Sequence, residues 1–409
     1  MSKAQLNQKP ILIGMTGGIE STVAAYLLKK QGYKVIGVAL TFFDQDEDAG
    51  PFHEYNVSDL QAVKEVCESL DIPFYAVNAK DEFQAYVIDN IIGRILSGQT
   101  FEPIIYFNQM LLKVLREKAQ KKFNTSDVAT GHYAKILKNQ RTGVFELMVS
   151  NDLASDQSYE LSALGKEDLE NLTLPLSELQ KSEVQKIYDL VKVRKIERDK
   201  KSLFQVIRDP RFTKFLEART PLDLRRKGNI YDHYSEASIA EHKGIHLFRV
   251  GQKNIFLHPE IKIDPELEVI SIVPFKGNIF LDYGHKLKYK TIYLKNIVLS
   301  HNLDVSQPLI GYVKLNPLGE KISCKVFLKN NSHALVVLDD EQTNHLLPAG
   351  SYVVFYHRKE DKGKIYLSGA VEVSGNFIEG DDYFTLPFTS SEEKREESLI
   401  RKPAERLLF

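Results

Sequence analysis

The residues of this sequence that are best suited to do chemistry form a short glycine-containing stretch near the amino end, GMTGGIEST at 14–22. Two adjacent glycines, Gly17 and Gly18, let the backbone curl so that successive N–H groups point toward one spot. A helix that begins directly after such a turn adds the positive end of its dipole. Hydroxyl side chains in the same stretch would add further donors. The stretch is therefore a candidate site for phosphate or pyrophosphate.

The segments before and after the glycine-containing stretch support an anion site. PILIGM (10–15) predicts a buried strand, TVAAYLLKKQ (22–31) a helix and KVIGVAL (34–40) a second buried strand. Together they form a βαβ unit, and such folds bind ligands at the carboxyl ends of their strands. The stretch lacks the Gly-Lys-Ser/Thr of a P-loop and is not G-x-G-x-x-G. A plain turn that uses its glycines only for geometry is the alternative interpretation.

Alternating strands and helices continue through residues 1–150, which predicts an α/β domain with an open parallel sheet and helices on both faces. Residues 151–240 are predicted to be a mostly helical, basic region. Within it, 186–227 contains 14 Lys or Arg and 6 Asp or Glu residues. Such a stretch is typical of a phosphate-contacting surface or of a solvated helical face.

Short apolar segments separated by Gly, Pro, Asn or Asp follow in 241–380 and predict a β-rich region ending in a barrel. The first two segments that we predict as strands are IHLFRVG (245–251) and NIFL (254–257). Residues 381–409 are predicted to be a charged tail.

The amino-acid composition excludes several classes of protein. The 409 residues carry a net charge of −1, which excludes a chain that is basic throughout. The two cysteines, Cys67 and Cys324, are too few for a disulfide framework or a cysteine-rich metal site, and their apolar surroundings predict core thiols. The chain has no apolar run of membrane-spanning length and no signal peptide. We expect a cytoplasmic protein, with neither a membrane nor DNA as a partner.

Several blocks together resemble a known family. GMTGGIEST is similar to G-M-S-G-G-V-D-S-S, the pyrophosphate loop of the bacterial tRNA 2-thiouridylases, which belong to the PP-loop ATP pyrophosphatases. GHYAKI (131–136) resembles A-T-G-H-Y-A-R, and DQSYEL (156–161) resembles K-D-Q-S-Y-F-L. AEHKGIHLFRVGQK (240–253) resembles G-E-H-x-G-x-x-x-x-T-I-G-Q-R-K. The resemblance implies a parallel-sheet PP-loop domain of the adenine nucleotide alpha hydrolase type, a helical middle and a carboxyl-terminal β-barrel. It also implies that the basic region 151–240 contacts tRNA.

The resemblance also implies an activity. The family binds ATP with Mg²⁺, and O2 of the wobble uridine of tRNA attacks the α-phosphate to give an adenylated base and pyrophosphate. A cysteine persulfide then delivers sulfur, AMP leaves, and a second cysteine helps to release the sulfur. No side chain of this sequence is assigned as a metal ligand.

The residues implied for each role follow from the matching motifs. The nucleotide-binding residues are Gly14, Met15, Thr16, Gly17, Gly18, Glu20, Ser21, Thr22, Leu40 and Gly131. The tRNA-contacting residues are Glu102, Pro103, Ile104, His132, Ser155, Asp156, Gln157, Val313, Lys314 and Ser351. For Gly131 we expect a close approach to the adenine or ribose. For His132, a local backbone contact is the alternative. For Asp156 and Gln157, ordinary turn chemistry is the alternative.

The sequence departs from the family at the reactive positions. Phe107 stands where the family has its nucleophilic cysteine, and Gln205 or Val206 takes the place of the second cysteine. Neither a phenyl ring nor an amide can carry a persulfide. Ile104 stands where many members have an aspartate, and Glu20 replaces the aspartate of the loop. The aromatic residues at 101, 106 and 107 would either stack on a flipped base or fill the core.

Three functional hypotheses therefore stay open. The first is a tRNA-modifying transferase of the sulfurtransferase type, whose sulfur arrives on a carrier protein or as free sulfide. The second is a tRNA-binding protein without thiolation activity. The third is a PP-loop enzyme that uses another nucleophile.

Overall fold

The computed structural model describes residues 9–44, 49–55, 59–193, 196, 209–257, 260–283, 288–300, 307–343, 347–359 and 363–375. The chain forms two compact units. Unit 1 comprises Met1–Gly93, Glu102–Pro221 and Glu360–Tyr366. Unit 2 comprises Arg94–Phe101, Leu222–Lys359 and Leu367–Phe409. Gln205 and Val206, residues 194–195 and 197–208 of the basic stretch, and the tail at 381–409 lie outside the described residues.

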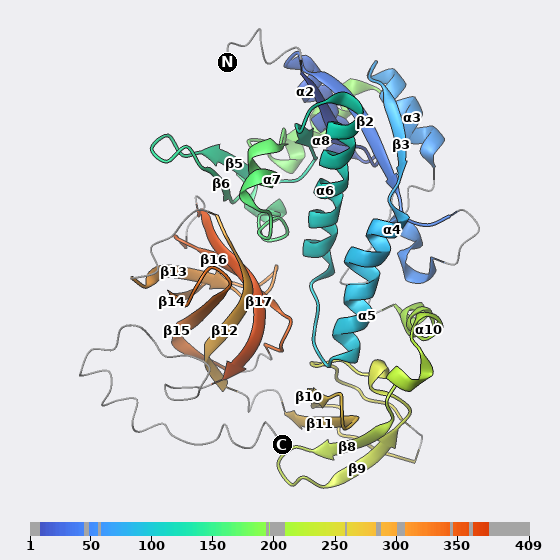
Figure 1. The fold of residues 1–409 in the computed structure, drawn as a ribbon, viewed down its shortest axis with the longest axis vertical. Coiled ribbons are helices and arrows are strands. Elements are labelled where there is room, and N and C mark those ends of the chain that lie inside the picture. Colours follow the sequence, from blue (N-terminus) through green and yellow to red (C-terminus); the bar gives the residue numbers. More distant parts are fainter. Residues whose placement is uncertain are drawn as a thin grey trace. The chain divides into compact units, whose positions relative to one another are not determined.

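Unit 1 contains a five-stranded sheet in the order β3-β2-β1-β4-β7, and every neighbouring pair is parallel. Two of its strands, β2 and β3, lie side by side in Figure 1. The strands are β1 (Pro10–Gly14), β2 (Lys34–Thr41), β3 (Phe74–Asn78), β4 (Val128–Ala129) and β7 (Leu172–Thr173). A separate hairpin joins β5 (Lys135–Lys138) to β6 (Phe145–Met148). The parallel sheet predicted for the amino-terminal domain is confirmed.

The helices of unit 1 follow the sheet strands in sequence. They are α2 (Ile19–Lys30), α3 (Leu60–Ser69), α4 (Lys80–Phe83), the π-helix η2 (Gln84–Ile88), α5 (Asp89–Leu96), which runs into unit 2, α6 (Pro103–Phe123), α7 (Lys166–Asn171), α8 (Lys181–Val191) and α10 (Pro210–Arg219). Short 3₁₀ turns cover Gly50–Tyr55 and Leu153–Ser155. Among the described residues, no helix combines the length and the apolar character that crossing a membrane requires.

The alternation of side chains along β1 explains how the helices are placed. Ile11 and Ile13 belong to one buried cluster with residues of α2, α3 and α8. Gly14 points to the opposite face, where a Cβ would lie 3.4 Å from Leu115 of α6. Since successive residues of a strand face opposite sides, helices cover both faces of the sheet, as the sequence predicts.

Unit 2 contains a four-stranded sheet and a closed barrel. The sheet has the order β10-β11-β8-β9, with β8 (Gly228–Asp232), β9 (Ser238–His242), β10 (Leu267–Val273) and β11 (Asn278–Tyr283). The barrel has the order β12-β15-β14-β13-β16-β17. Its strands are β12 (Lys288–Leu299), β13 (Leu309–Lys314), β14 (Ile322–Leu328), β15 (His333–Thr343), β16 (Tyr352–Tyr356) and β17 (Ile365–Gly375). The predicted barrel is confirmed.

Two strand predictions at the start of this region are wrong. In 245–251, a 3₁₀ turn covers Ile245–Leu247, and Phe248 N donates to Ile245 O at 3.1 Å. The apolar side chains Ile245 and Phe248 are buried in the core of this unit, so the sequence correctly indicates burial but not a strand. In 254–257, Asn254 has a φ of 53° and Phe256 is 78% exposed. A left-handed residue interrupts a strand, so this segment forms none.

Candidate nucleotide and RNA site

The loop between β1 and α2 has the backbone shape that the glycine pair predicts. Gly17 has a φ of 78°, in the left-handed region, and Gly18 is the N-cap of α2 with extended φ and ψ. Within the described residues, no side chain makes a capping hydrogen bond to this helix. Because the first N–H groups of a helix have no acceptor within the helix, an uncapped N-terminus leaves donors available for an anion.

Two hydroxyls hold this loop in shape. Thr16 N donates to Ser21 Oγ, and Gly18 N donates to Thr16 Oγ1, both at 3.3 Å. Ser21 Oγ donates in turn to Gly18 O at 3.2 Å. Thr22 differs, because its Oγ1 is buried and has no hydrogen-bond partner in the described part of the chain. A buried unpaired hydroxyl is costly, which makes Thr22 the hydroxyl of this loop that a ligand would satisfy.

Gly131 lies directly against the start of α2. A Cβ at this position would be 2.7 Å from the carbonyl carbon of Glu20 and 2.9 Å from Ser21 N. The missing side chain therefore allows a close approach to the backbone of Glu20 and Ser21. The approach of Gly131 to the adenine or ribose stays a prediction. The next residue, His132, is half-buried, with its Nδ1 2.9 Å from Thr130 Oγ1.

Gln157, in DQSYEL (156–161), forms hydrogen bonds with GHYAKI (131–136). Its N donates to Tyr133 O at 2.8 Å, and its Oε1 accepts from Tyr133 N at 3.0 Å. Its Nε2 donates to Glu160 Oε2 at 3.2 Å. Gln157 therefore connects residues next to the loop with a carboxyl group three positions farther on.

Asp156 stabilises the turn in which it lies. Its carboxylate accepts from Ser150 N at 2.8 Å, Ser158 N at 3.3 Å and Ser158 Oγ at 2.7 Å. These bonds correspond to the local turn chemistry that we gave as the alternative to tRNA contact. The neighbouring Ser155 is half-buried, and its N donates to Asp152 O at 3.2 Å.

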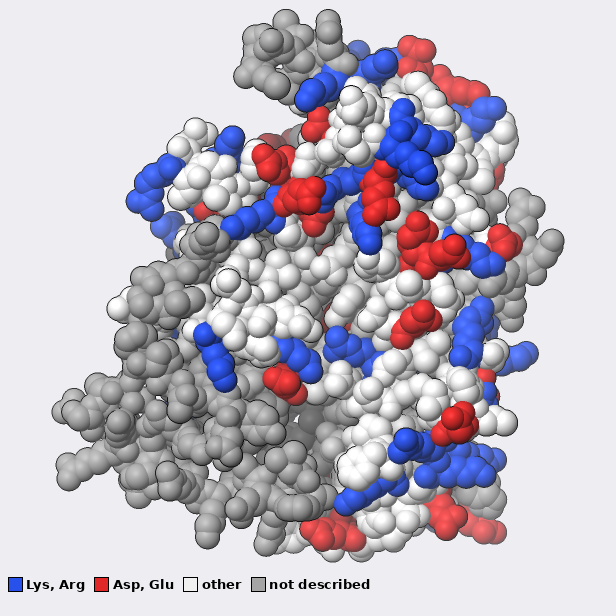
Figure 2. Space-filling model, in the orientation of Figure 1, with Lys and Arg blue, Asp and Glu red and all other residues white. Residues whose placement is uncertain are grey.

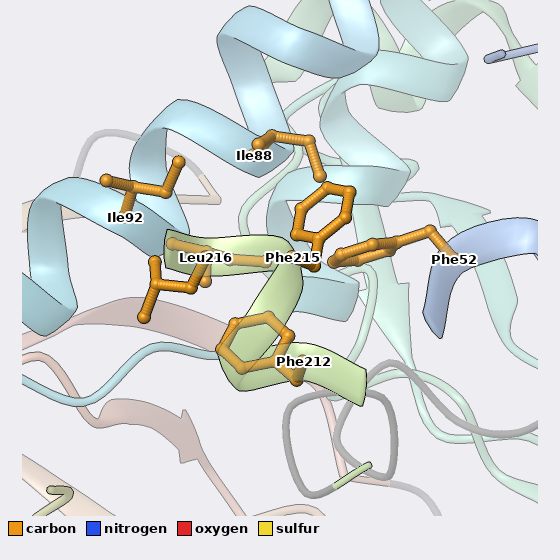
Figure 3. A pocket seen from close by; sticks show the side chains of 7 residues that line it. Phe52, Ile88, Ile92, Phe212, Phe215 and Leu216 are labelled. Atoms are coloured by element: carbon orange, nitrogen blue, oxygen red, sulfur yellow. The ribbon is translucent and has the colours of Figure 1, made fainter. Parts of the chain in front are cut away.

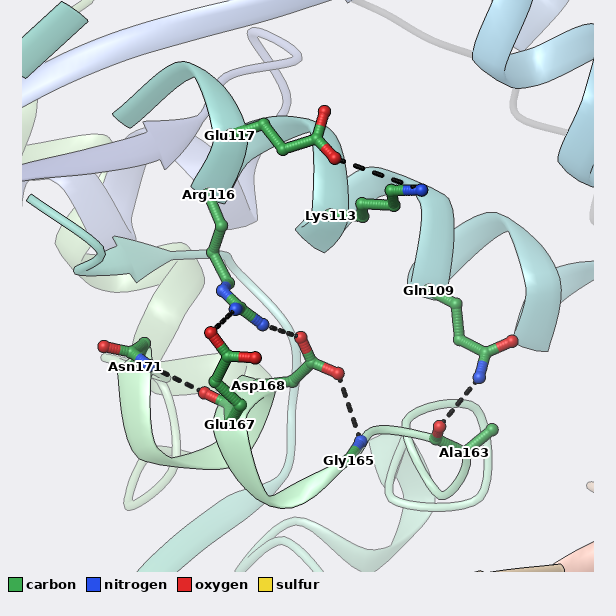
Figure 4. A network of polar contacts seen from close by, with 9 residues as sticks. All are labelled: Gln109, Lys113, Arg116, Glu117, Ala163, Gly165, Glu167, Asp168 and Asn171. Carbon is green, nitrogen blue, oxygen red and sulfur yellow. Dashed lines mark hydrogen bonds and ion pairs between the residues drawn. The ribbon is translucent and has the colours of Figure 1, made fainter. Parts of the chain in front are cut away.

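The long helix α6 holds the same segment from its other side (Figure 4). Asn108 Nδ2 donates to Glu160 O at 3.2 Å, and Gln109 Nε2 donates to Ala163 O at 2.8 Å. About two turns farther along, Arg116 forms ion pairs with Glu167 and Asp168. The segment 160–168 is thus connected to α6 at Glu160, Ala163, Glu167 and Asp168.

The start of α6 carries the residues that replace the family's reactive segment. Glu102 is the N-cap and Pro103 is the first helical residue. The Glu102 side chain makes no capping bond, and its burial raises the pKa of the carboxyl to about 7. Ile104 and Phe107 are half-buried.

Phe107 packs against other aromatic rings. Its ring centroid is 5.6 Å from that of Phe42 and 6.3 Å from that of Phe83, both in edge-on geometry. Phe83 also contacts Phe52, which lines an apolar pocket with side chains of η2, α5 and α10 (Figure 3). The pocket is lined by Phe52, Ile88, Ile91, Ile92, Phe212, Phe215 and Leu216. Phe107 therefore extends an aromatic cluster at the position where the resemblance implies the family's cysteine.

Both cysteines are buried, as predicted. Burial raises the pKa of Cys67 and of Cys324 to about 12. Since the thiolate is the reactive form, neither thiol is suited to carry sulfur. Among the described residues, no group of three or more His, Cys, Asp or Glu side chains is arranged to hold a metal.

The remaining predicted site residues are distributed over both units. In unit 1, Met15 and Leu40 are buried in the sheet. In unit 2, the side chains of Val313 and Ser351 are buried in the barrel. Lys314 is half-buried and its Nζ donates to Pro317 O at 3.3 Å. Acidic and basic side chains are interspersed on the described surface that Figure 2 shows.

Glu160 is not among the site residues predicted from the sequence. This residue is half-buried, and its burial raises the pKa of its carboxyl to about 7. The signal was present in the motif itself, because DQSYEL has glutamate where K-D-Q-S-Y-F-L has phenylalanine.

Known proteins are similar to this chain over most of its length. The family model described as "tRNA methyl transferase HUP domain" matches residues 9–203. The tRNA-specific 2-thiouridylase MnmA of Clostridium perfringens is 36% identical over 355 residues, covering 86% of this chain and 96% of the relative. The protein of that name in Clostridioides difficile is 28% identical and covers 91% and 98%. A solved tRNA methyltransferase subunit from Methanocaldococcus jannaschii covers 52% of this chain and 88% of its own at a TM-score of 0.31 and 16% identity.

Proposed function

Because the chain belongs to the tRNA-specific 2-thiouridylase family, we propose that it binds ATP at the β1–α2 loop and adenylates a base of tRNA. The observation that carries this proposal is the uncapped N-terminus of α2, preceded by a glycine in the left-handed region. This shape suits a polyphosphate, because backbone N–H groups and the helix dipole both favour negative charge. The buried, unpartnered Thr22 Oγ1 supports the same ligand.

The residues around the loop also fit Mg²⁺ brought in with the nucleotide. Glu20 in the first turn of α2 would hold the ion together with phosphate oxygens, since hard cations prefer oxygen ligands. The ion would offset charge on the phosphates as pyrophosphate leaves. Gly131 keeps the neighbouring segment close to Glu20, so the segment carrying His132 lies beside the same helix end.

The two halves of the family's reaction depend on different groups. Adenylation needs the nucleotide, the base and a way to remove a proton, but no protein thiol. Sulfur delivery by persulfide needs a cysteine, and Phe107 occupies that position within an aromatic core. We therefore propose that adenylation is retained and that sulfur arrives as sulfide or on a carrier protein.

A second candidate is a tRNA-binding protein without thiolation activity. The observation that favours it is also Phe107, because a ring that packs on Phe42 and Phe83 fills space in which a persulfide would react. The third hypothesis, a PP-loop enzyme with another nucleophile, would show ATP turnover without RNA.

Exchange of labelled pyrophosphate into ATP separates these candidates. Exchange that requires tRNA supports adenylation of the base, exchange without RNA favours another nucleophile, and tRNA binding without exchange favours the scaffold. Mass analysis of tRNA nucleosides from a deletion strain then tests thiolation itself. Loss of 2-thiouridine establishes the transferase, and unchanged 2-thiouridine removes it.

A further inference from the structure

A continuous line of contacts joins the β1–α2 loop to Glu160. Gly131 lies against the backbone of Glu20 and Ser21, and Tyr133, two residues later, exchanges two hydrogen bonds with Gln157. Gln157 Nε2 then donates to Glu160 Oε2 at 3.2 Å. The Glu160 carboxyl is therefore held on the segment that borders the proposed nucleotide site.

The same residue is fixed to the part of α6 that carries the family's reactive position. Asn108, the neighbour of Phe107, donates from Nδ2 to Glu160 O at 3.2 Å. Gln109 fixes the chain three residues after Glu160 through Ala163 O. Glu160 is thus connected to α6 through Asn108 and, through Gln157 and Tyr133, to the segment beside the loop.

The surroundings of Glu160 keep its carboxyl able to exchange a proton near neutral pH. Burial is the main cause that raises its pKa to about 7, and the negative charge of Asp156 adds to the rise, while the bond from Gln157 opposes it. The contacts from α6 and from the Tyr133 segment come through the neutral amides of Asn108 and Gln157. A general base works best when its pKa lies near the working pH.

Adenylation of a uridine at O2 removes the proton on N3. The sequence has Ile104 where many family members have an aspartate, so α6 offers no carboxylate at that position. We propose that Glu160 contacts the target pyrimidine and accepts its N3 proton as O2 attacks the α-phosphorus of ATP. This inference rests on the proposed function.

The step balances without any further reactant. The N3–H bond breaks, and the proton moves to a carboxylate oxygen of Glu160. The electron pair left on the N3–C2–O2 system forms the O2–P bond. The bond between the α-phosphorus and the bridging oxygen breaks, and pyrophosphate leaves with that electron pair.

The test is the pH profile of tRNA-dependent ATP–pyrophosphate exchange by the full chain. For the unmodified protein the rate should rise as the pH passes about 7, because only the carboxylate form accepts the proton. Glu160→Gln should lower the rate by about 10²-fold or more and abolish that rise. Glu160→Asp, which restores a carboxylate, should recover part of the rate and keep a pH-dependent rise.

Glu170→Gln is the matched control, because Glu170 is an exposed residue of α7 in the same part of the chain. It should leave the rate and the profile unchanged. Thermal unfolding and tRNA binding of each variant show whether it is folded. A folded Glu160→Gln protein with the unmodified rate and profile overturns the inference and leaves the proposed function intact. Absence of tRNA-dependent exchange in the unmodified protein overturns the proposed function first, and the inference with it.

Discussion

A Cβ on Gly131 would lie 2.7 Å from the carbonyl carbon of Glu20, so these two residues are in direct backbone contact. This contact places the segment of His132 against the uncapped end of α2. A distance below 3.0 Å to backbone atoms cannot be relieved by rotating a side chain. The position of the two segments relative to one another therefore depends on glycine at 131.

Gly131→Ala should consequently destabilise unit 1 by about 1–3 kcal/mol and weaken ATP binding, because the start of α2 must shift. Thermal unfolding and calorimetric titration with ATP and Mg²⁺ measure the two effects. Gly93→Ala is the control, since a Cβ there meets nothing within 4 Å. That variant should be as stable as the parent or slightly more stable. Equal behaviour of the two variants would refute the assigned contact.

Thr22→Val should separate the loop's stability from its binding. The variant removes a buried hydroxyl without a partner and keeps the shape, so the free protein should be equally stable or more stable by about 1 kcal/mol. ATP affinity should fall several-fold, because the ligand loses a partner. Titration and thermal unfolding of the free protein provide the two readings. A loss of stability with unchanged affinity would show that the hydroxyl has a structural role instead.

The ion pairs of Arg116 should contribute more than an exposed pair. The Arg116 side chain is 18% exposed and bridges Glu167 and Asp168, so Arg116→Met leaves a partly buried carboxylate without its cation. We expect a loss of about 1–3 kcal/mol in the free energy of unfolding. Lys64→Met, at an exposed pair with Glu68, should change it by less than about 0.5 kcal/mol. Denaturant unfolding of both variants tests this, and similar losses would contradict it.

The buried cysteines predict that the native protein lacks a reactive thiol. Burial raises the pKa of Cys67 and of Cys324 to about 12, so alkylation by iodoacetamide near neutral pH should be negligible until the chain is unfolded. Phe107→Cys should gain one modified residue, since position 107 is only half-buried. Intact-mass measurement before and after unfolding provides the test. Rapid native labelling of the parent protein would contradict the structure at these positions.

Glu102 should make stability depend on pH with a defined sign. Its folded pKa is raised from 4.5 to about 7, so between these pH values the folded state binds more protons than the unfolded state. Stability from this group is complete below pH 4.5 and is lost as the pH rises through about 7. Glu102→Gln should remove that decline, which amounts to about 3 kcal/mol because one pKa unit corresponds to about 1.4 kcal/mol. Unfolding across this pH range measures it, and an unchanged slope would contradict the burial of the carboxyl.

Features of the fold and the site that depend on neighbouring residues could be predicted from the sequence. Contacts between residues far apart in the sequence could not. The turn at Gly17 and Gly18 follows from local residue types, so the β1–α2 loop was predictable. The contact of Gly131 with Glu20 and the bond from Gln157 to Glu160 join residues that only the tertiary fold brings together. β8 and β9 were not anticipated, because GNIYD and SIAEH are short and mix polar with apolar residues. The predicted strands at 245–251 and 254–257 failed because apolar composition alone cannot distinguish a strand from a buried turn.

Calorimetric titration of the full chain with ATP and Mg²⁺ tests most directly whether the β1–α2 loop holds the phosphates of ATP. A parallel titration uses Gly17→Val, which places a side chain where Gly17 has a φ of 78° and a Cβ would lie 2.4 Å from Ile196 Cδ1. We predict saturable one-to-one binding by the parent protein and at least about tenfold weaker binding by a folded Gly17→Val variant. No heat with the parent, or equal affinity in the two proteins, would contradict binding at this loop.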